Sequence, residues 1–382
     1  MELDKTTQHL LYLMRCALQN KVPEPISKLD YDKLYRLSKF HSVVAMVAMA
    51  MESGGLLSES YTSAECIKQW KDAKVKAVRK NILLDAEREE IFQFFDRECI
   101  WHIPLKGVIL KEMYPNMGMR QMADNDILFD STYQSQVKSF MESRGYEVIA
   151  FEQGNHDTYQ KQPIYNFELH TALFDEKFHI TKWSEYYQNI KQRLIRNAED
   201  SWCYHFTDED FYVYFLLHGY KHYSGGGTGI RFLSDIFVFL TQKNETLNWS
   251  YVEKELKVLG IYDFETKIRK LAFKLFGDKA YSLMGEEQEL LDYLIGAGTY
   301  GTINNYVEKS LKKLQGTEGP ITVWTKVRYT LNRLFPNVAH MKQYSAFCRK
   351  HPWSIPFFWV YRLYKAATVR KKDIVQEIKA LK

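Results

Sequence analysis

Two aspartates two positions apart, Asp124 and Asp126, are the residues of this chain best suited to bind a metal ion. They lie at the start of an apolar stretch that reads as a strand, and side chains of a strand alternate between its two faces, so both carboxylates should share one face. Carboxylates this close repel each other unless a hard cation lies between them, and Mg²⁺ bound by carboxylates and substrate phosphates is the usual solution. An Asp-x-Asp also occurs by chance in turns, so its surroundings decide its meaning.

The stretch before the aspartates predicts a strand, a glycine turn and a helix. Residues 100–107, "IWHIPLKG", read as a buried strand ending at Gly107, and a helix should follow at once and end at Pro115. Free backbone N–H groups at a helix start favour phosphate, and Lys106 could add a positive charge. We therefore expect a phosphate site at this turn.

The stretch after the aspartates predicts a helix and then a third acidic residue. A helix is expected over 131–144, with Gly145 beyond its end. The segments that follow alternate like strands, and "YNFELHTALF" should place Glu168 and His170 on one face. Glu168 is the natural third carboxylate, and His170 could orient it or be an ordinary neutral, hydrogen-bonded histidine.

This order of elements resembles the nucleotidyltransferase superfamily of the DNA polymerase beta type. More closely, "LKGVILKEMYP", Arg120, "DND" and "ELH" are similar to a bacterial family known as uncharacterised nucleotidyltransferases, as are the later "LLHGYKHY" and "IRFLSDIFVFL". The resemblance spans roughly residues 40–350, and its specific part lies within 104–170. The chain departs from the superfamily at Asn125, where an aliphatic residue is usual, so a polar side chain is expected on the face opposite the aspartates.

The resemblance implies transfer of a nucleoside monophosphate from an NTP to a hydroxyl or phosphate acceptor, with release of pyrophosphate. It also implies two Mg²⁺ ions, with Mn²⁺ as the other possible ion, bound by Asp124, Asp126 and Glu168, the last of which could help to remove the acceptor proton. The nucleotide-binding residues expected on this basis are Lys106, Gly107, Arg120, His222 and Arg231. Two alternatives stay open: an inactive nucleotide- or partner-binding module, and a toxin-like enzyme that modifies protein or tRNA.

Several of these residues also have purely structural interpretations. Arg120 is suited to bidentate phosphate contact but could equally form a salt bridge. Arg231 and Asp235 lie one helical turn apart and could pair with each other. His218 and His222 lie four apart on a helix and could bind zinc, but the sequence offers no general-base glutamate and no evident third ligand.

The glycine-rich loop Ser224–Gly229 follows a helix rather than a strand, so the phosphate-loop and dinucleotide fingerprints do not apply to it. It could be a mobile lid over the cleft or a plain connection between helices. His41, in an apolar helix, is interpreted as a core residue.

Composition indicates a globular protein. At 382 residues, with 46% hydrophobic and 15% aromatic residues, the chain can bury a large core in two or three domains. It has neither the basic start of a signal peptide nor an apolar run of the length a membrane span needs. Its five cysteines are scattered and argue against a disulfide framework or a zinc site, so we expect a cytoplasmic protein.

The expected fold class is α+β, with a small mixed nucleotidyltransferase sheet flanked by N-terminal helices and a helical C-terminal domain. Among the N-terminal helices, we expect one at about 4–19, one at about 30–52, and a long pair between 59 and 98. The expected domains are an N-terminal helical segment, the α/β core and the C-terminal helical domain, over residues 1–98, 99–178 and 179–382.

Charge limits the partners. Residues 361–382 hold seven Lys and Arg and two acids, an excess that equals the net charge of +5 of the whole chain, so the remainder is balanced. We therefore expect an NTP substrate, an acceptor that is a small molecule rather than a macromolecule, and no stable complex with nucleic acid. The basic, aromatic tail could touch an anionic membrane surface, although a solvated amphipathic end helix is the preferred interpretation.

Overall fold

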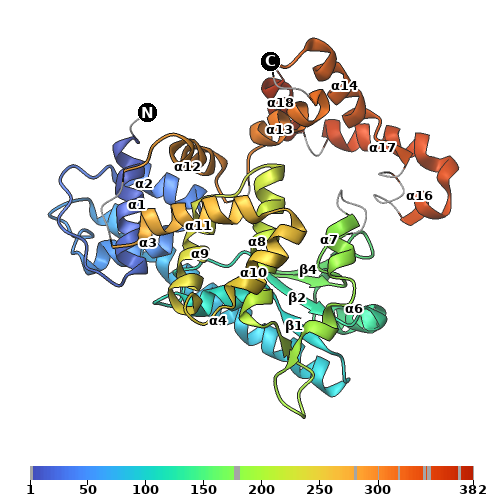
Figure 1. The fold of residues 1–382 in the computed structure, drawn as a ribbon, viewed down its shortest axis with the longest axis horizontal. Helices are drawn as coiled ribbons and strands as arrows, with labels where there is room; N and C mark the ends of the chain where they lie inside the picture. Colours follow the sequence, from blue (N-terminus) through green and yellow to red (C-terminus); the bar gives the residue numbers. More distant parts are fainter. Residues whose placement is uncertain are drawn as a thin grey trace.

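The structure, a computed structural model, combines one small sheet with helices on both of its faces (Figure 1). The expected α+β class is confirmed: the sheet is mixed, and helices precede and follow it. The structure describes residues 3–175, 181–278, 282–299, 301–316, 319–338, 341, 346–368 and 371–381.

The sheet has five strands in the order β1-β2-β5-β4-β3. β2 and β5 run parallel to each other, and every other neighbouring pair in this sheet is antiparallel. Two short strands form a separate antiparallel pair. The strands are β1 (His102–Pro104), β2 (Asn125–Phe129), β3 (Glu147–Ala150), β4 (His156–Lys161), β5 (Tyr165–His170), β6 (Ile195–Arg196) and β7 (Tyr204–His205).

The N-terminal helices differ in two places from the expectation. The helix expected at about 4–19 is present as α1 (Lys5–Leu18), but that at about 30–52 is two helices, α2 (Tyr31–Phe40) and α3 (Val44–Ser53). The chain turns between them at Ser42, whose φ is 54°, a left-handed conformation that no helix continues. The predicted pair between 59 and 98 is instead one 34-residue helix, α4 (Ala64–Arg97), since no proline or glycine interrupts it.

Short helices connect the strands. The prediction of one helix from Gly107 to Pro115 is wrong in extent. The structure has a four-residue helical turn there, followed by a 3₁₀ turn that ends at Met113. The helix expected over 131–144 begins with a 3₁₀ turn that the Asp130 carboxylate caps by accepting from the Thr132 N–H. These elements are α5 (Gly107–Leu110), η1 (Lys111–Met113), η2 (Ser131–Tyr133), α6 (Gln134–Ser143), α7 (Thr181–Tyr186) and η3 (Ile190–Arg193).

The remaining helices follow the sheet in the chain. Figure 1 shows α13 to α18 to one side of the molecule, with α13 leading away from α8. Within the described residues, no helix is both long and apolar enough to cross a membrane. The helices are α8 (Asp208–Gly225), α9 (Ile230–Lys243), α10 (Trp249–Leu259), α11 (Tyr262–Phe276), α12 (Glu286–Ala297), α13 (Ile303–Gln315), α14 (Val323–Leu334), α16 (Ala346–Lys350), η4 (Pro352–Ser354), α17 (Ile355–Thr368) and α18 (Lys371–Ala380).

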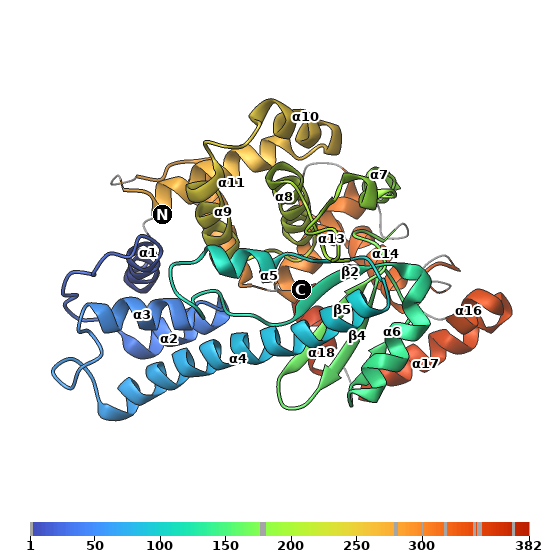
Figure 2. The same ribbon diagram turned by 90° about the horizontal axis from the view of Figure 1, so that it is seen from below.

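Two large cores result. One lies between the sheet and the helices α4 and α6, and Figure 2 shows α4 running from the N-terminal helices to the sheet. The other joins α1 and α3 to α8, α9, α10 and α11. The N-terminal helices and the helices that follow the sheet therefore share one apolar core. The three-domain division proposed above remains a prediction.

Alternation along β2 and β5 separates an apolar face from a polar one. Ile127, Phe167 and Leu169 are fully buried in the core against α4 and α6. Asn125 also points to that side, where its amide donates to the Leu84 carbonyl at 3.3 Å. Its oxygen accepts from Arg88 Nη1 at 3.1 Å, so α4 satisfies the polar side chain expected on this face.

The glycine-rich stretch Ser224–Gly229 includes the last two residues of α8 and packs tightly against the end of α12 and the chain that follows it. A Cβ at Gly227, where φ is 111°, would lie 2.5 Å from the Cβ of Ala297. A Cβ at Gly229 would lie 2.7 Å from the carbonyl carbon of Gly298. These glycines allow close backbone packing, which favours the connection over the lid.

A buried ion pair joins the loop before β2 to α9. Arg120 donates to both carboxylate oxygens of Asp235, from Nε at 2.7 Å and from Nη2 at 3.0 Å. The Tyr114 hydroxyl also donates to Asp235, at 2.7 Å. Both charged side chains are more than nine-tenths buried, so removing either partner would leave the other charge without compensation.

Asp235→Asn should therefore lower the free energy of unfolding by about 3–5 kcal/mol, because Arg120 would stay buried without its counter-charge. Urea unfolding of wild type and variant measures the change. Asp278→Asn is the matched control, since its ion pair with Lys21 is exposed and should leave the midpoint almost unchanged. Equal effects of the two substitutions would contradict a stabilising role for the buried ion pair of Arg120 with Asp235.

His41, at the junction of α2 and α3, is fully buried, and burial lowers its pKa to about 4 from an ordinary value of 6.5. The folded state therefore binds fewer protons than the unfolded chain between these pH values. The stability that the protein gains from a neutral, buried His41 is therefore present above pH 6.5 and is lost as the pH falls toward 4. The interpretation of His41 as a core residue agrees with its burial.

His41→Gln should reduce the loss of stability on acidification. Between pH 7 and pH 5 the wild type should lose about 2 kcal/mol more of its free energy of unfolding than the variant. Urea unfolding at the two pH values tests this, since the other histidines are common to both proteins. The same pH dependence in both proteins would contradict the lowered pKa of His41.

Candidate functional site

Parallel pairing of β2 and β5 brings two of the predicted carboxylates together. Asp126 is the register partner of Glu168, so their side chains leave the sheet side by side on the face opposite the apolar core. Asp124 lies just before β2, and its charge and that of Asp126 both raise the pKa of Glu168. The structure thus gathers the three predicted acids at one place.

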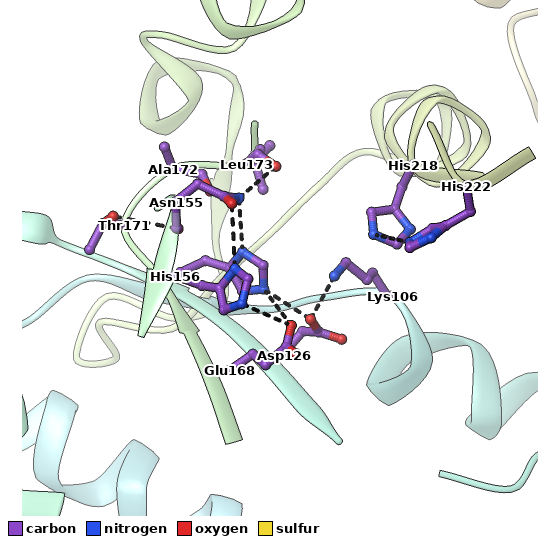
Figure 3. Close-up of polar contacts among 11 residues, drawn as sticks. Lys106, Asp126, Asn155, His156, Glu168, Thr171, Ala172, Leu173, His218 and His222 are labelled. Carbon is purple, nitrogen blue, oxygen red and sulfur yellow. Dashed lines mark hydrogen bonds and ion pairs between the residues drawn. The ribbon is translucent and has the colours of Figure 1, made fainter. Parts of the chain in front are cut away.

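Asp126 is the most tightly held of the three. Lys106 Nζ donates to its Oδ1 at 2.6 Å and His170 Nε2 lies 2.9 Å from the same oxygen (Figure 3). Burial opposes ionisation of Asp126, but Lys106 and His170 outweigh it and hold the pKa of this carboxyl well below its usual value. Asp126 is therefore a carboxylate at neutral pH.

Lys106 reaches Asp126 from an unusual backbone conformation. Its φ is 49° and its ψ is −111°, which costs a non-glycine residue about 1–3 kcal/mol. The ion pair with the buried Asp126 helps to hold it there. Strain of this kind is typical of sites where a side chain must be placed exactly for binding or catalysis.

The other two acids are shifted in the opposite direction. Burial, followed by the charges of Asp126 and Asp124, raises the pKa of Glu168 to about 7. Burial and the charge of Asp126 also raise the pKa of Asp124, although Lys106 and Arg231 partly offset this. The protein's own cations therefore do not fully compensate the negative charge gathered here.

This donor set fits a divalent metal ion. Carboxylate oxygens are the ligands that Mg²⁺ and Mn²⁺ prefer, and Asp124, Asp126 and Glu168 supply them in a partly buried place. Their mutual repulsion, expressed in the raised pKa values of Asp124 and Glu168, is what a bound cation would relieve.

Two histidines border the carboxylates. His156, on β4, has Nε2 3.7 Å from Glu168 Oε2, and His170 Nε2 lies 3.8 Å from the same oxygen. Burial, then the charge of Lys106, lowers the pKa of both, to about 4 for His170, so both rings are neutral. His170 therefore contacts both Asp126 and Glu168, which the sequence left open.

Helix α8 lies across from the carboxylates. Figure 3 shows its residues His218 and His222 on the far side of Lys106 from the sheet, with their Nε2 atoms 3.3 Å apart. Loss of hydration around its ring, then the charge of Lys221, lowers the pKa of His222. Among the described residues, the group of three possible metal ligands found in the molecule does not include this pair, so zinc gains no support.

The expected nucleotide-binding residues differ in the contacts they make. Arg231 donates from Nη1 to the Gln121 carbonyl at 3.0 Å and lies near enough to Asp124 to affect its pKa. Arg120, however, is buried in the ion pair with Asp235, so the salt-bridge interpretation holds for it. A Cβ at Gly107 would collide with the Arg120 guanidinium, so this glycine makes room for the buried arginine. Phosphate contact at Arg120 and Gly107 remains a prediction.

Sequence reasoning missed three side chains near the acids. Lys80, on α4, donates to the Ala123 carbonyl at 2.8 Å next to Asp124. Lys221, on α8, has a lowered pKa, because loss of hydration and the charge of Lys106 outweigh the opposing effect of Glu168. None of the three has a local signal in the sequence: the two lysines lie in ordinary charged helical stretches, and the pairing of β4 with β5 is what brings His156 to Glu168.

A family of known sequences matches the greater part of this chain. The model of the family described as "Uncharacterised nucleotidyltransferase" matches residues 27–277, which include the sheet and α8 and α9. Neither a curated protein nor a solved structure matches the sequence. The match covers more than half of the chain and agrees with the carboxylate arrangement, and the chain belongs to this family of uncharacterised nucleotidyltransferases.

Proposed function

We propose that this protein transfers a nucleoside monophosphate from an NTP to a hydroxyl or phosphate acceptor and releases pyrophosphate. The observation that carries the proposal is the pairing of Asp126 with Glu168 on adjacent parallel strands, with Asp124 beside them. A divalent ion bound by these carboxylates, Mg²⁺ or Mn²⁺, would polarise the phosphoryl group and neutralise charge on the leaving group. Family membership supports the general reaction.

The two ends of the carboxylate cluster have different tasks in this proposal. Asp126, ionised and fixed by Lys106 and His170, is a rigid metal ligand. Glu168, whose pKa is about 7, can bind a cation as a carboxylate or accept the proton of the attacking hydroxyl. The repulsion from Asp126 and Asp124 that raises this pKa favours a bound cation at Glu168.

The nucleotide phosphates would lie between the sheet and the helices α8 and α9. Lys106, Lys221 and Arg231 are three of the cations near the acids, and they would orient and neutralise the triphosphate. His222, on α8, could contact the base or sugar as a neutral ring. We propose a small-molecule acceptor and a cytoplasmic protein, in line with the balanced charge of the chain outside its tail.

Labelling separates this proposal from its alternatives. The protein would be incubated with each α-labelled NTP, Mg²⁺ or Mn²⁺ and a host lysate, and both released pyrophosphate and labelled acceptor would be measured. Label in the small-molecule fraction supports the proposal, and label in protein or tRNA supports the toxin-like alternative. Metal-dependent NTP binding without pyrophosphate release would identify an inactive binding module.

Asp124→Asn and Glu168→Gln should each slow nucleotide transfer by more than about 100-fold. Their effects on stability should differ from that of Asp126→Asn. Without metal, Asp124→Asn should keep or raise the melting temperature because it removes a charge that burial and Asp126 disfavour. Asp126→Asn should lower it, because Lys106 loses its partner.

Pyrophosphate release and differential scanning fluorimetry test these expectations, and Glu147→Gln, at an exposed position on β3, is the control. Near wild-type turnover of Asp124→Asn at saturating NTP would contradict the metal assignment.

A further inference from the structure

His156 provides a nitrogen atom beside the third carboxylate. Its Nε2 lies 3.7 Å from Glu168 Oε2, and the ligand atoms of His156, Glu168 and His170 all lie within 4.8 Å of one another. Two atoms bound to one ion at about 2.1 Å each are at most about 4.2 Å apart. The separation of His156 from Glu168 therefore suits a shared ion without rearrangement of either side chain.

The side chain of Asn155 determines which nitrogen of His156 is free. Asn155 Nδ2 donates to the carbonyls of Ala172 at 2.9 Å and Leu173 at 3.2 Å, which fixes the orientation of the amide. Its Oδ1 is then left to accept from His156 Nδ1, at 3.4 Å (Figure 3). The proton of His156 is thus on Nδ1, and the lone pair of Nε2 points toward Glu168. Metal-binding histidines are commonly oriented by such a second hydrogen bond.

His170 has the opposite tautomer. Its Nε2 lies 2.9 Å from Asp126 Oδ1, and a carboxylate oxygen can only accept, so the ring proton is on Nε2 and the unprotonated Nδ1 faces the Asn155 amide at 3.4 Å. In this form His170 has no lone pair directed at the carboxylates. It is a positioning residue for Asp126.

We propose that His156 and Glu168 together bind the ion on the β4 side of the site, and that this nitrogen ligand makes the site select a first-row transition-metal ion such as Mn²⁺ over Mg²⁺. Mg²⁺ is bound almost entirely by oxygen and gives up its water reluctantly, whereas imidazole nitrogen is a good ligand for transition metals. The proposal rests on the function proposed above only in taking this place as the metal site. Its test measures metal binding without nucleotide and therefore does not depend on the proposed reaction.

The test uses Mn²⁺ bound to the full-length protein without nucleotide. Electron spin-echo spectroscopy detects a ¹⁴N nucleus bonded directly to Mn²⁺, and we expect this coupling in wild type and in His170→Gln but not in His156→Gln. The ratio of the Mg²⁺ to the Mn²⁺ dissociation constant should fall at least about tenfold in His156→Gln. His205→Gln, at an exposed histidine bonded to Asn197, is the matched control and should behave as wild type.

Absence of ¹⁴N coupling in the wild type, which requires no variant to fold, would overturn the proposal. Coupling that survives in a folded His156→Gln would overturn it as well. A nitrogen-coupled Mn²⁺ signal without pyrophosphate release from any NTP would uphold this site and reject the proposed reaction. Turnover with Mg²⁺ and no nitrogen coupling would uphold the proposed reaction and reject His156 as a metal ligand.

Discussion

The parallel pairing of β2 with β5 is the constraint on which the candidate site depends. Because Asp126 and Glu168 are register partners, both carboxylates leave the same face of the sheet, while Phe167 and Leu169 enter the core against α4. A slip of one residue would send Glu168 into that apolar core. The hydrophobic packing that stabilises the sheet therefore also determines that the acids meet.

Acids gathered in a partly buried place require compensation, and the surrounding structure supplies part of it. Lys106, in a strained backbone conformation, and His170 stabilise the charge of Asp126, while Glu168 and Asp124 remain under-compensated. This asymmetry leaves negative charge that a bound cation would neutralise. The buried pair of Arg120 with Asp235 serves a different purpose, since it fastens the loop before β2, which carries Asp124, to α9.

Local patterns in the sequence predicted much of this arrangement. The α+β class and the strand that carries Glu168 follow from the periodicity of apolar residues, which depends on neighbouring positions. The break at Ser42 and the continuous helix α4 depend on backbone conformation and packing that no short pattern expresses. The partner of Arg120 is 115 residues away, and such contacts are set by the tertiary fold.

The histidines show the same limit at the site itself. Alternation placed His170 beside Glu168, but only the neighbouring strand β4 brings His156 to the same oxygen, and only the fold brings Asn155 between the two rings. Recognition of the family supplied the reaction class, and the geometry supplied the chemical character of each acid.

The most direct test of the account is a crystal structure of the protein with Mn²⁺ and a non-hydrolysable NTP, with anomalous scattering used to locate the metal. The account predicts an anomalous peak within about 2.0–2.4 Å of carboxylate oxygens of Asp126 and Glu168, with the triphosphate bound beside it toward α8. A nucleotide bound elsewhere, or metal peaks that avoid both carboxylates, would contradict the central claim that these paired strands form a nucleotidyltransferase site.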